Sequence, residues 1–513
     1  MADLSKLKVA IGQMEVVEGR PSANEAACDR MVDRALDAGA DVLVVPNSLS
    51  DARNVRLIGL NDSRIDIAGN VVILDVCGET YRIGIDEPIS DCDFSIYSDV
   101  QPFALHGPRR SSHALSVLVR PVGMRDGGKH VCAFEGASKA FGPNGEVFAS
   151  LRDDFEEDFC VVSFAREAKL APSTDKKLLK ALLSTIRRFD NQVLASAPKW
   201  IIGLSGGLDS CVVAALLVLA LGPDRVVGYN MATRFNSEMT KGNAAMLAAT
   251  LGIPLRSGSI EDLVVSLGNT LVHYGYPVDA LGGVVLENAQ ARARGNLLSA
   301  FAAVEGGVVV NNGNRVEGAL GYATLYGDAI GALAPIGDLS KVALFDIARD
   351  INEVIGCEAI PVNLLPIETS EGYTWEMMPS AELASGQRDP MKWFYHDWLI
   401  GVLLGDESET PLPVEEAACK VMSHYHETRL LDSAVAKWVR FYGLDDPAAF
   451  IADLDWVVRS MRASAFKRIQ APPYIAISNS ASQRPFDSAQ VAPELSCEYN
   501  ALRAQILRME NAR

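Results

Sequence analysis

The stretch WIIGLSGGLDS, residues 200–210, decides the fold of the larger part of this chain. Its apolar start is typical of a buried strand, and the glycines that follow favour a tight turn. The next segment, 209–221, is apolar almost throughout and predicts a buried helix. A glycine-rich turn between a strand and a helix can bind phosphate, because its backbone N–H groups and the helix N-terminus face the anion. We therefore expect an anion site at this turn.

The same alternation of strand and helix continues beyond the turn. A rhythm of this kind indicates a parallel, doubly wound sheet. Past Pro361 the chain reads as mostly helical, and residues 361–380 and 385–412 are expected to form cover loops. The predicted strands are Val226–Met231, Pro254–Ser257 and Val308–Val310, and the predicted helices are Ser237–Leu251 and Val284–Val304.

The first 165 residues also read as alternating strands and helices. A Gly-Pro-Asn-Gly turn at 142–145 separates two strand-like stretches. We expect a first domain at 1–165, a linker with the first helix of the next domain at 166–198, and a second domain at 199–513. The predicted strands are Lys8–Gln13, Asp41–Pro46, Val71–Leu74, Arg82–Ile85 and Ala114–Val119, and the predicted helix is Pro21–Ala38.

Composition narrows the class of protein. A chain of 513 residues has room for roughly two to four domains, and its net charge of −18 disfavours nucleic acids and anionic membranes as partners. The longest apolar run, Cys211–Leu221, is too short to span a bilayer, and the N-terminus shows no signal-peptide pattern. The nine cysteines are scattered, which argues against a disulfide framework or a zinc site. We expect a cytoplasmic protein.

The side chains of the turn add chemistry to the anion cradle. Ser205 and Ser210 can donate hydroxyl hydrogen bonds, and Asp209 can hold a magnesium ion that bridges phosphates. An ordinary tight turn is the alternative interpretation, although Ser-Gly-Gly-x-Asp-Ser is more elaborate than such a turn needs. The glycine-rich lysine loop of kinases and GTPases is excluded, because no Gly-Lys-Ser/Thr follows.

Ser-Gly-Gly-x-Asp-Ser resembles the signature of the ATP-pyrophosphatase-loop enzymes, and further segments resemble one family among them, the NAD synthetases. This resemblance implies a Rossmann-like, doubly wound α/β domain. Its motifs occur in the family's order over about 270 residues. They are Glu287–Arg294 (ENAQARAR), Asn311–Glu317 (NNGNRVE), Gly321–Asp328 (GYATLYGD), Lys341 after Ala334–Ile336, Pro379–Leu383 (PSAEL) with Gln387, and Lys467–Pro473 (KRIQAPP).

The resemblance implies ATP-dependent amidation of deamido-NAD through an acyl-adenylate, with ATP and Mg²⁺ as the co-substrate and metal. Asp328 would orient or deprotonate ammonia and Lys341 would contact phosphate, as the catalytic pair. Asp209 and Glu317 would bind the metal. The implied ATP-binding residues are Gly203, Leu204, Ser205, Gly206, Gly207, Leu208, Asp209, Ser210, Asn312, Arg234 and Ser380. The implied deamido-NAD-binding residues are Asn288, Arg292, Glu317 and Lys467.

Three positions depart from the family pattern. Asn312 replaces a threonine but can still donate and accept a hydrogen bond. Arg315 replaces a lysine, which keeps the charge and changes its geometry. Ala332 stands where some ammonia-dependent members have a carboxylate. None of these differences removes a reacting group.

Residues 1–165 resemble, more weakly, the nitrilase-like amidase domain of glutamine-dependent NAD synthetases. The similar segments are Val9–Gln13, Ala40–Pro46, Gly136–Ser138 and Gly142–Gly145. That domain uses a Glu-Lys-Cys triad. Here Asn47 replaces the glutamate, Asp86 replaces the cysteine, and no lysine lies between Lys8 and Lys129. We interpret Cys92, six residues past the expected position, as structural.

The first hypothesis is thus an ammonia-using NAD synthetase with a degenerate amidase domain, and several alternatives stay open. The protein could be glutamine-dependent in name or through a separate glutaminase. It could amidate another acceptor, such as xanthosine monophosphate, or be a non-catalytic scaffold. The resemblance also implies a homo-oligomer, a dimer or larger.

Overall fold

The computed structural model describes residues 3–49, 55–86, 89, 91–105, 115–164, 170–194, 196–380, 382–384, 389–406, 408, 412–479 and 495–509. Ala114, Ala381 and Gln387, which belong to predicted elements or motifs, lie outside these ranges. The chain divides into two compact units. The first comprises Met1–Phe103, Gly107–Gly127 and Val131–Phe189, and the second comprises Ala104–His106, Gly128–His130 and Asp190–Arg513.

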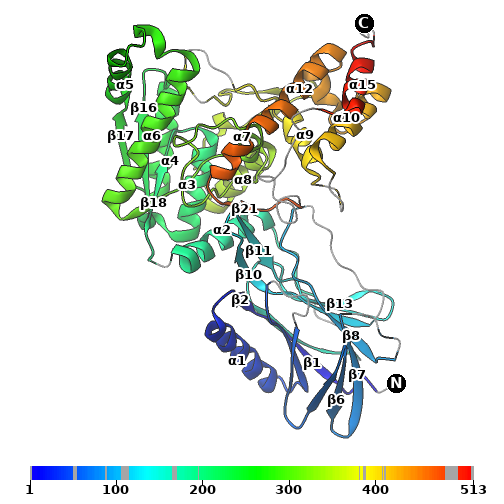
Figure 1. Ribbon diagram of the computed structural model, residues 1–513. Helices are drawn as coiled ribbons and strands as arrows, with labels where there is room; N and C mark the ends of the chain where they lie inside the picture. Colours follow the sequence, from blue (N-terminus) through cyan, green and yellow to red (C-terminus); the bar gives the residue numbers. More distant parts are fainter. Residues whose placement is uncertain are drawn as a thin grey trace. The chain divides into compact units, whose positions relative to one another are not determined.

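A four-stranded parallel sheet forms the centre of the second unit, in the order β17-β16-β15-β18 (Figure 1). Its strands are β15 (Lys199–Gly203), β16 (Val226–Ala232), β17 (Leu255–Ser259) and β18 (Gly307–Val309). The helices between them are α3 (Leu208–Leu221), α4 (Glu238–Leu251), α5 (Glu261–His273) and α6 (Gly283–Glu305). The predicted doubly wound parallel sheet is confirmed.

Burial explains why the helices of this part could be predicted from the sequence. Helix α3 is apolar on all sides because it contacts β15, β16, α4 and α8, so nine of its residues are buried. Helix α6 contacts β15 and β18, and its Leu298 and Ala302 pack against Ile201 and Val227 of the sheet.

The strand order creates a crevice at one edge of the sheet. From β15 the chain proceeds to β16 on one side, whereas β18 pairs with the other side of β15. At such a switch point the connections leave in opposite directions, and ligands of open α/β sheets bind outside the carboxyl ends of the strands there. The Ser205–Ser210 turn leaves β15 at this position.

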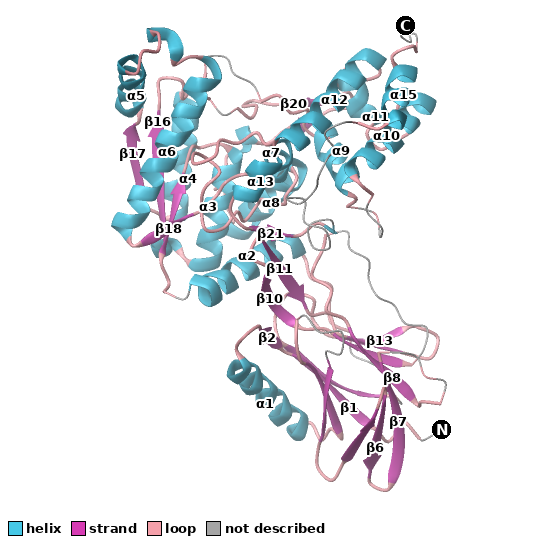
Figure 2. Cartoon of the chain, in the orientation of Figure 1, coloured by secondary structure: helices cyan, strands magenta, loops and turns pink. Residues whose placement is uncertain are grey.

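The rest of the second unit is mostly helical, as predicted (Figure 2). Within the described residues, no helix is both long and apolar enough to cross a membrane. The helices are α7 (Arg315–Leu320), α8 (Lys341–Ile355), α9 (Tyr395–Leu404), α10 (Val414–Thr428), α11 (Ala436–Phe441), α12 (Pro447–Ala463), α13 (Ala465–Gln470) and α15 (Cys497–Ile506). The short strands are β19 (Ile367–Glu368), β20 (Tyr373–Thr374) and β21 (Tyr474–Ala476).

The first unit is a sandwich of two sheets with α1 (Pro21–Asp37). One sheet has the order β14-β1-β3-β4 and the other β13-β12-β9-β8-β7-β6-β5, while β10 pairs with β2 and β11. Its strands are β1 (Lys8–Gln13), β2 (Glu15–Val17), β3 (Val42–Pro46), β4 (Val55–Gly59), β5 (Arg64–Ala68), β6 (Val71–Val76), β7 (Glu79–Ile85), β8 (Phe94–Ser98), β9 (Ser116–Val119), β10 (Val122–Asp126), β11 (His130–Glu135), β12 (Lys139–Phe141), β13 (Val147–Ser150) and β14 (Asp158–Ser163).

Apolar side chains from the two sheets meet in one core. Val9 and Val44 from the first sheet lie in the same cluster as Leu74, Ile83 and Val117 from the second. On its other side β1 approaches α1, because a Cβ added at Gly12 would lie 3.2 Å from the Met31 side chain.

The expected alternation of strands and helices is wrong for the first unit after α1. Strands β5, β6 and β7 follow one another as antiparallel hairpins. Cys77 and Gly78, which join β6 to β7, both have positive φ angles of 50° and 86°. Two such residues form the type of turn that closes a tight hairpin, which leaves no length of chain for a helix.

Helix α2 (Lys177–Phe189), expected to open the second domain, clusters with the first unit. Its Lys177 forms an ion pair with Asp153 at 2.9 Å, and its Arg188 forms one with Glu15 at 2.8 Å. The boundary between the units therefore falls after Phe189 rather than before the helix.

Gly206 is the position at which the turn depends most on glycine. Its φ is +87°, and an added Cβ would lie 1.9 Å from the carbonyl oxygen of Thr240 in α4. We predict that Gly206→Ala lowers the free energy of unfolding by roughly 2 kcal/mol or more, because strain and a backbone clash add. Urea unfolding would measure this.

Gly242→Ala is the matched control. Gly242 lies in α4 with open space around its Cβ position, so alanine there should be neutral or stabilising. Equal unfolding free energies for Gly206→Ala and the wild type would contradict the prediction.

Candidate active site

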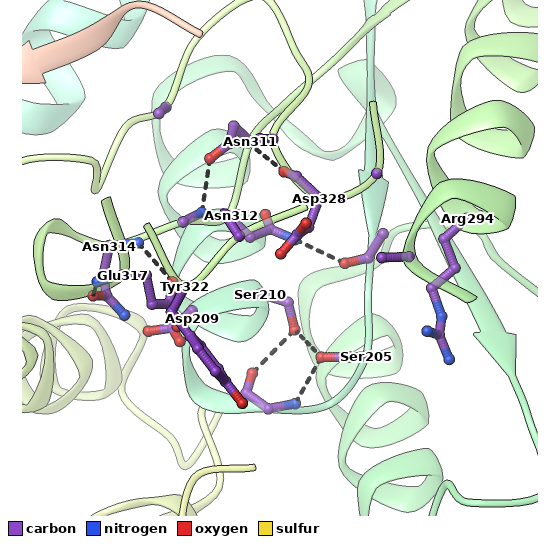
Figure 3. Close-up of a pocket in the computed structure, with 18 of the residues that line it drawn as sticks. Ser205, Asp209, Ser210, Arg294, Asn311, Asn312, Asn314, Glu317, Tyr322 and Asp328 are labelled. Atoms are coloured by element: carbon purple, nitrogen blue, oxygen red, sulfur yellow. Dashed lines mark hydrogen bonds between the residues drawn. The ribbon is translucent and has the colours of Figure 1, made fainter. Parts of the chain in front are cut away.

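The Ser205–Ser210 turn forms a small hydrogen-bonded loop at the start of α3 (Figure 3). Ser205 Oγ lies 3.1 Å from Ser210 Oγ and accepts a hydrogen bond from Gly207 N at 3.2 Å. Ser210 Oγ donates to the carbonyl oxygen of Gly207. Gly207 is the N-cap of α3, and no side chain caps the helix. The first N–H groups of α3 are thus left for an anion.

A pocket of about 380 Å³ opens beside this turn, and most of the predicted site residues line it. It extends from the carboxyl ends of β15, β16 and β18 to the segments that carry the later motifs. The predicted residues in its wall are Gly203, Ser205, Gly207, Leu208, Asp209, Ser210, Asn312, Glu317, Asp328, Lys341, Ser380 and Lys467.

Five predicted residues lie outside the wall. The Leu204 side chain is fully buried, and Gly206 packs against α4. Arg234 pairs with Glu261 at 3.1 Å on the surface.

Asn288 and Arg292 share one face of α6 as expected, but this face contacts the 321–328 segment. Asn288 Oδ1 accepts a hydrogen bond from Thr324 Oγ1 at 2.7 Å, and Arg292 Nε donates to the Leu325 carbonyl at 3.3 Å.

Lys341 and Asp209 form a buried ion pair at the base of the pocket. Lys341 Nζ donates to both carboxylate oxygens of Asp209, at 2.9 and 2.7 Å, and lies 5.1 Å from the centroid of the Trp393 ring. The backbone N–H of Lys341 donates to Asp397 Oδ1 at 2.7 Å, which fixes the start of α8. Burial opposes the lysine charge, but Asp209 and Glu317 outweigh it, so the pKa of Lys341 is raised.

Glu317 caps a helix and also lies in a buried place beside a second carboxylate. Glu317 Oε2 accepts a hydrogen bond from Asn314 N at 3.1 Å, and Asn314 Oδ1 accepts from Glu317 N, so the two residues form a capping box at the start of α7. Burial and the nearby charge of Asp209 raise the pKa of Glu317 to about 8. Two carboxylates that repel each other are a suitable ligand set for a divalent cation.

Asp328 is held in a polar corner of the pocket. Its Oδ1 accepts a hydrogen bond from Thr324 N at 2.6 Å. Burial raises the pKa of Asp328, although that hydrogen bond and the charges of Lys467 and Arg294 oppose the rise. A carboxylate with a raised pKa is a better proton acceptor, as a base for ammonium requires.

Two of the residues that depart from the family pattern, Asn312 and Arg315, make defined contacts in the structure. Asn312 Nδ2 donates to the Gly203 carbonyl at 2.9 Å and so ties the segment after β18 to the end of β15. Arg315 does not line the pocket; it forms ion pairs with Asp406 and Asp338.

Several pocket residues lie within the motifs but had no predicted role, among them Arg294 and Tyr322. Arg294 Nε donates to the Met231 carbonyl at 3.1 Å, and burial lowers the pKa of Arg294 to about 10. Tyr322 also lines the pocket. The motif position of Arg294, two residues after Arg292 in ENAQARAR, was the signal that could have found it.

Glu382 and Asn236 form a contact that no local pattern could predict, because Glu382 lies in the motif Pro379–Leu383 and Asn236 lies in none. Glu382 Oε2 accepts hydrogen bonds from Asn236 Nδ2 at 3.1 Å and from Thr240 Oγ1 at 3.0 Å. Asn236 and Glu382 both line the pocket. They lie 146 positions apart in the chain, so only the tertiary structure brings them together.

With this geometry in view, comparison with known proteins identifies the class. Residues 182–412 match the family model of NAD synthase. This match includes the Ser205–Ser210 turn and most of the residues that line the pocket. The chain is 33% identical over 302 residues to a glutamine-dependent NAD(+) synthetase of Synechocystis sp., with 57% of this chain and 51% of that protein covered. It is 36% identical over 223 residues to one of Thermotoga maritima, with 43% and 36% covered.

Two solved structures share the fold over nearly the whole chain. A glutamine-dependent NAD+ synthetase of Acinetobacter baumannii, solved with ADP, has a TM-score of 0.57 at 20% identity, covering 95% of this chain and 100% of that one. One of Cytophaga hutchinsonii has a TM-score of 0.67 at 13% identity, covering 98% and 99%. The predicted fold class, an α/β sandwich followed by a domain with a doubly wound parallel sheet, is confirmed.

The chain spans about half the length of the curated relatives it matches. Their printed names all specify glutamine dependence, which fits the alternative of a glutamine-dependent enzyme better than the first hypothesis of an ammonia-dependent one.

Lys467 offers a test of how the pocket divides between substrates. Its Nζ donates to the carbonyls of Gly321 and Ala323, at 2.8 and 2.7 Å, on either side of Tyr322. We predict that Lys467→Ala raises the KM for deamido-NAD about tenfold and the KM for ATP much less, because it frees the segment on which Asn288 also rests. Initial-rate assays would measure both constants.

Lys241→Ala, which removes a surface lysine of α4, should leave both constants unchanged. If Lys467→Ala instead lost affinity for ATP alone, the assignment of Lys467 to the deamido-NAD subsite would be wrong.

Proposed function

We propose that this chain is an NAD synthetase, which uses ATP to convert the nicotinate carboxylate of deamido-NAD into the amide of NAD. The observation that carries the proposal is the pocket at the switch point of an NAD synthase domain, where Asp209, Glu317 and Lys341 meet beside an uncapped helix N-terminus. A scaffold without catalysis would have no need for this set of buried charges.

The chemistry has two steps. A carboxylate oxygen of deamido-NAD attacks the α-phosphorus of ATP, and pyrophosphate leaves with the electron pair of the broken P–O bond. Ammonia then attacks the acyl carbon, AMP leaves, and a proton is lost to give the amide. The Ser205–Ser210 turn supplies hydroxyl and backbone N–H donors for the pyrophosphate. The buried cation Lys341 lies close to this turn, because it forms an ion pair with Asp209.

Asp209 and Glu317 would hold Mg²⁺. The fit rests on the chemistry of two neighbouring carboxylates: burial and the nearby charge of Asp209 raise the pKa of Glu317, and a bound divalent cation would oppose that rise. Bound Mg²⁺ supplies charge neutralisation at phosphorus. In the metal-free chain the positive charge of Lys341 compensates Asp209.

Asp328 is our candidate for the proton acceptor in the second step. Ammonia near neutral pH is mostly ammonium, so a carboxylate that binds and deprotonates it would raise the supply of nucleophile. Asn311 keeps this residue in place, since its Nδ2 donates to the carbonyls of Asp328 at 2.7 Å and Ile330 at 2.9 Å.

The nitrogen source we propose is ammonia, free or from a separate glutaminase. Asn47 follows β3 and Asp86 follows β7, at the positions where the resemblance expects the glutamate and the cysteine. Asp86 has a φ of +60°, and its Oδ1 accepts a hydrogen bond from Ser98 N at 3.0 Å. In a cysteine glutaminase the thiolate attacks the amide carbon of glutamine, ammonia leaves, and water hydrolyses the thioester that has formed. The carboxylate of Asp86 is a much weaker nucleophile, so this position supports loss of glutaminase chemistry.

Cys92 is a poor substitute for the missing nucleophile. Burial raises the pKa of the Cys92 thiol, and Asp93 and Asp91 raise it further against the opposing charge of Arg82. A thiol with a raised pKa carries little thiolate at neutral pH. The names of the relatives nevertheless favour a second candidate, in which the protein depends on glutamine. A homo-oligomer and a partner glutaminase remain parts of the proposal.

Glu317→Gln tests the metal site. Glutamine can still accept the hydrogen bond from Asn314, so the capping box persists while the charge is lost. We predict that NAD formation falls about a hundredfold or more, as the loss of a charge-stabilising group does. Coupled detection of NAD would measure it. Glu238→Gln, at a side chain that is 91% exposed, is the control, and wild-type turnover of Glu317→Gln would refute the metal assignment.

The nitrogen source is tested with purified protein, ATP, Mg²⁺ and deamido-NAD. We predict NAD formation with ammonium salts, rising with pH as free ammonia increases, and none above background with ammonia-free glutamine. Glutamine-dependent synthesis that Cys92→Ala abolishes would establish an active amidase unit. Cys160→Ala, at another partly buried cysteine of the first unit, serves as its control.

A further inference from the structure

A buried ion cluster lies behind the pocket and joins the elements that carry its charged residues. Arg315 is the first residue of α7 and is 5% exposed. Its guanidinium makes a two-pronged contact with Asp406, with NH1 at 2.5 Å and NH2 at 2.7 Å from the two carboxylate oxygens. Arg315 Nε also lies 3.5 Å from Asp338 Oδ1.

Asp338 extends this cluster to a distant part of the chain. Asp338 Oδ2 accepts hydrogen bonds from the backbone N–H groups of Ile477 and Ser478, at 2.8 and 2.7 Å. Its Oδ1 accepts from Ser478 Oγ at 2.9 Å. The bonded segment directly follows β21, which itself follows the Lys467–Pro473 motif. The cluster thus holds the chain that leaves the Lys467 helix.

The backbone of Arg315 also contacts the residues just before α8, and its guanidinium reaches Asp338 in the same segment. Arg315 N donates to the Leu339 carbonyl at 3.0 Å, and the next residue, Ser340, caps α8 through a hydrogen bond to Ala343 N. Lys341 is the first residue of that helix. Glu317 lies on α7, two residues after Arg315. The two helices whose first turns carry Glu317 and Lys341 are therefore both tied to Arg315.

We propose that Arg315 is a positioning residue of the adenylation site, which sets the placement of Glu317 and Lys341 against Asp209 through its two-pronged ion pair with Asp406. This assignment rests on the proposed function. Arg315 itself does not line the pocket, so it acts through the residues it holds.

The geometry of the guanidinium explains why the charge alone does not suffice. A planar fork meets both oxygens of one carboxylate and has a further N–H for a second carboxylate, whereas an ammonium is a point charge on a flexible stem. Lysine at this position would retain the positive charge of the cluster and lose the fixed orientation. Displacements of about 1 Å in a reacting constellation can cost roughly a hundredfold in rate.

Arg315→Lys is the decisive variant, because it restores the residue of the family motif and keeps the charge. We expect kcat for NAD formation to fall about tenfold or more and the Mg²⁺ concentration for half-maximal rate to rise several-fold, with the KM for ATP changed less than threefold. Asp406→Asn should show the same pattern, and the double variant should be no worse than the poorer single variant.

Arg225→Lys is the matched control. Arg225 pairs with the buried Asp190 at 2.8 Å in the same unit, and neither residue lines the pocket. This variant should lose thermal stability but keep kcat and the Mg²⁺ requirement. If Arg315→Lys does not fold, Asp406→Glu, which keeps the charge and shifts the carboxylate, replaces it in the same assays.

The outcomes separate the two proposals. An inactive wild type overturns the proposed function and this assignment with it. An active wild type with Arg315→Lys at full kcat and an unchanged Mg²⁺ requirement overturns the positioning role alone. So does a strictly additive double variant, since two partners of one ion pair must be coupled.

Discussion

The ion pair between Asp209 and Lys341 is the interaction on which the arrangement of the pocket depends. It joins the first turn of α3, which leaves the central strand β15, to the first residue of α8, about 130 positions later in the chain. Lys341 is 2% exposed, and an isolated charge at so buried a place would be costly, so the lysine depends on the carboxylate of Asp209. The pair therefore requires both helices to begin at one point, and the Ser205–Ser210 turn and Glu317 are arranged around it.

The sequence was informative where local pattern and burial agree. The apolar segment 209–221 predicted a buried helix, and the glycine-rich turn before it favoured an anion cradle over an ordinary tight turn. The Arg315–Asp406 pair could not be predicted, because its partners lie 91 positions apart and carry no mutual signal. The hairpin at Cys77 and Gly78 was missed since a cysteine at positive φ is unusual.

The placement of Asn288 and Arg292 shows a different limit. Their spacing correctly put both on one face of α6, but spacing cannot say what that face meets. In the structure both reach the segment 321–328, which supports the Asp328 corner of the pocket. Their influence on substrate binding would then pass through this segment unless the ligand extends to the exposed face of α6.

In the first unit, the residues that form the core differ from those at the positions where catalysis would occur. Its sandwich core is filled by residues such as Val9, Val44 and Ile83, none of which needs to react with a substrate. Asn47 and Asp86 stand at strand ends, where a substitution alters reactive atoms but removes no core packing. A fold of this kind can therefore outlast its activity.

The charges of the pocket show how an acidic protein can bind anionic substrates. Asp209, Glu317 and Asp328 offset the positive charges of Lys341, Lys467 and Arg294, so side chains alone give the pocket no strong positive excess. The attraction for phosphate must come largely from backbone N–H groups at the start of α3, which no side chain caps. Such an attraction does not depend on the net charge of −18 and acts only on an anion that reaches the turn. The paired carboxylates add little attraction or repulsion of their own, because Asp209 is paired with Lys341 and burial raises the pKa of Glu317, so a bound metal ion would supply the further positive charge that a triphosphate needs.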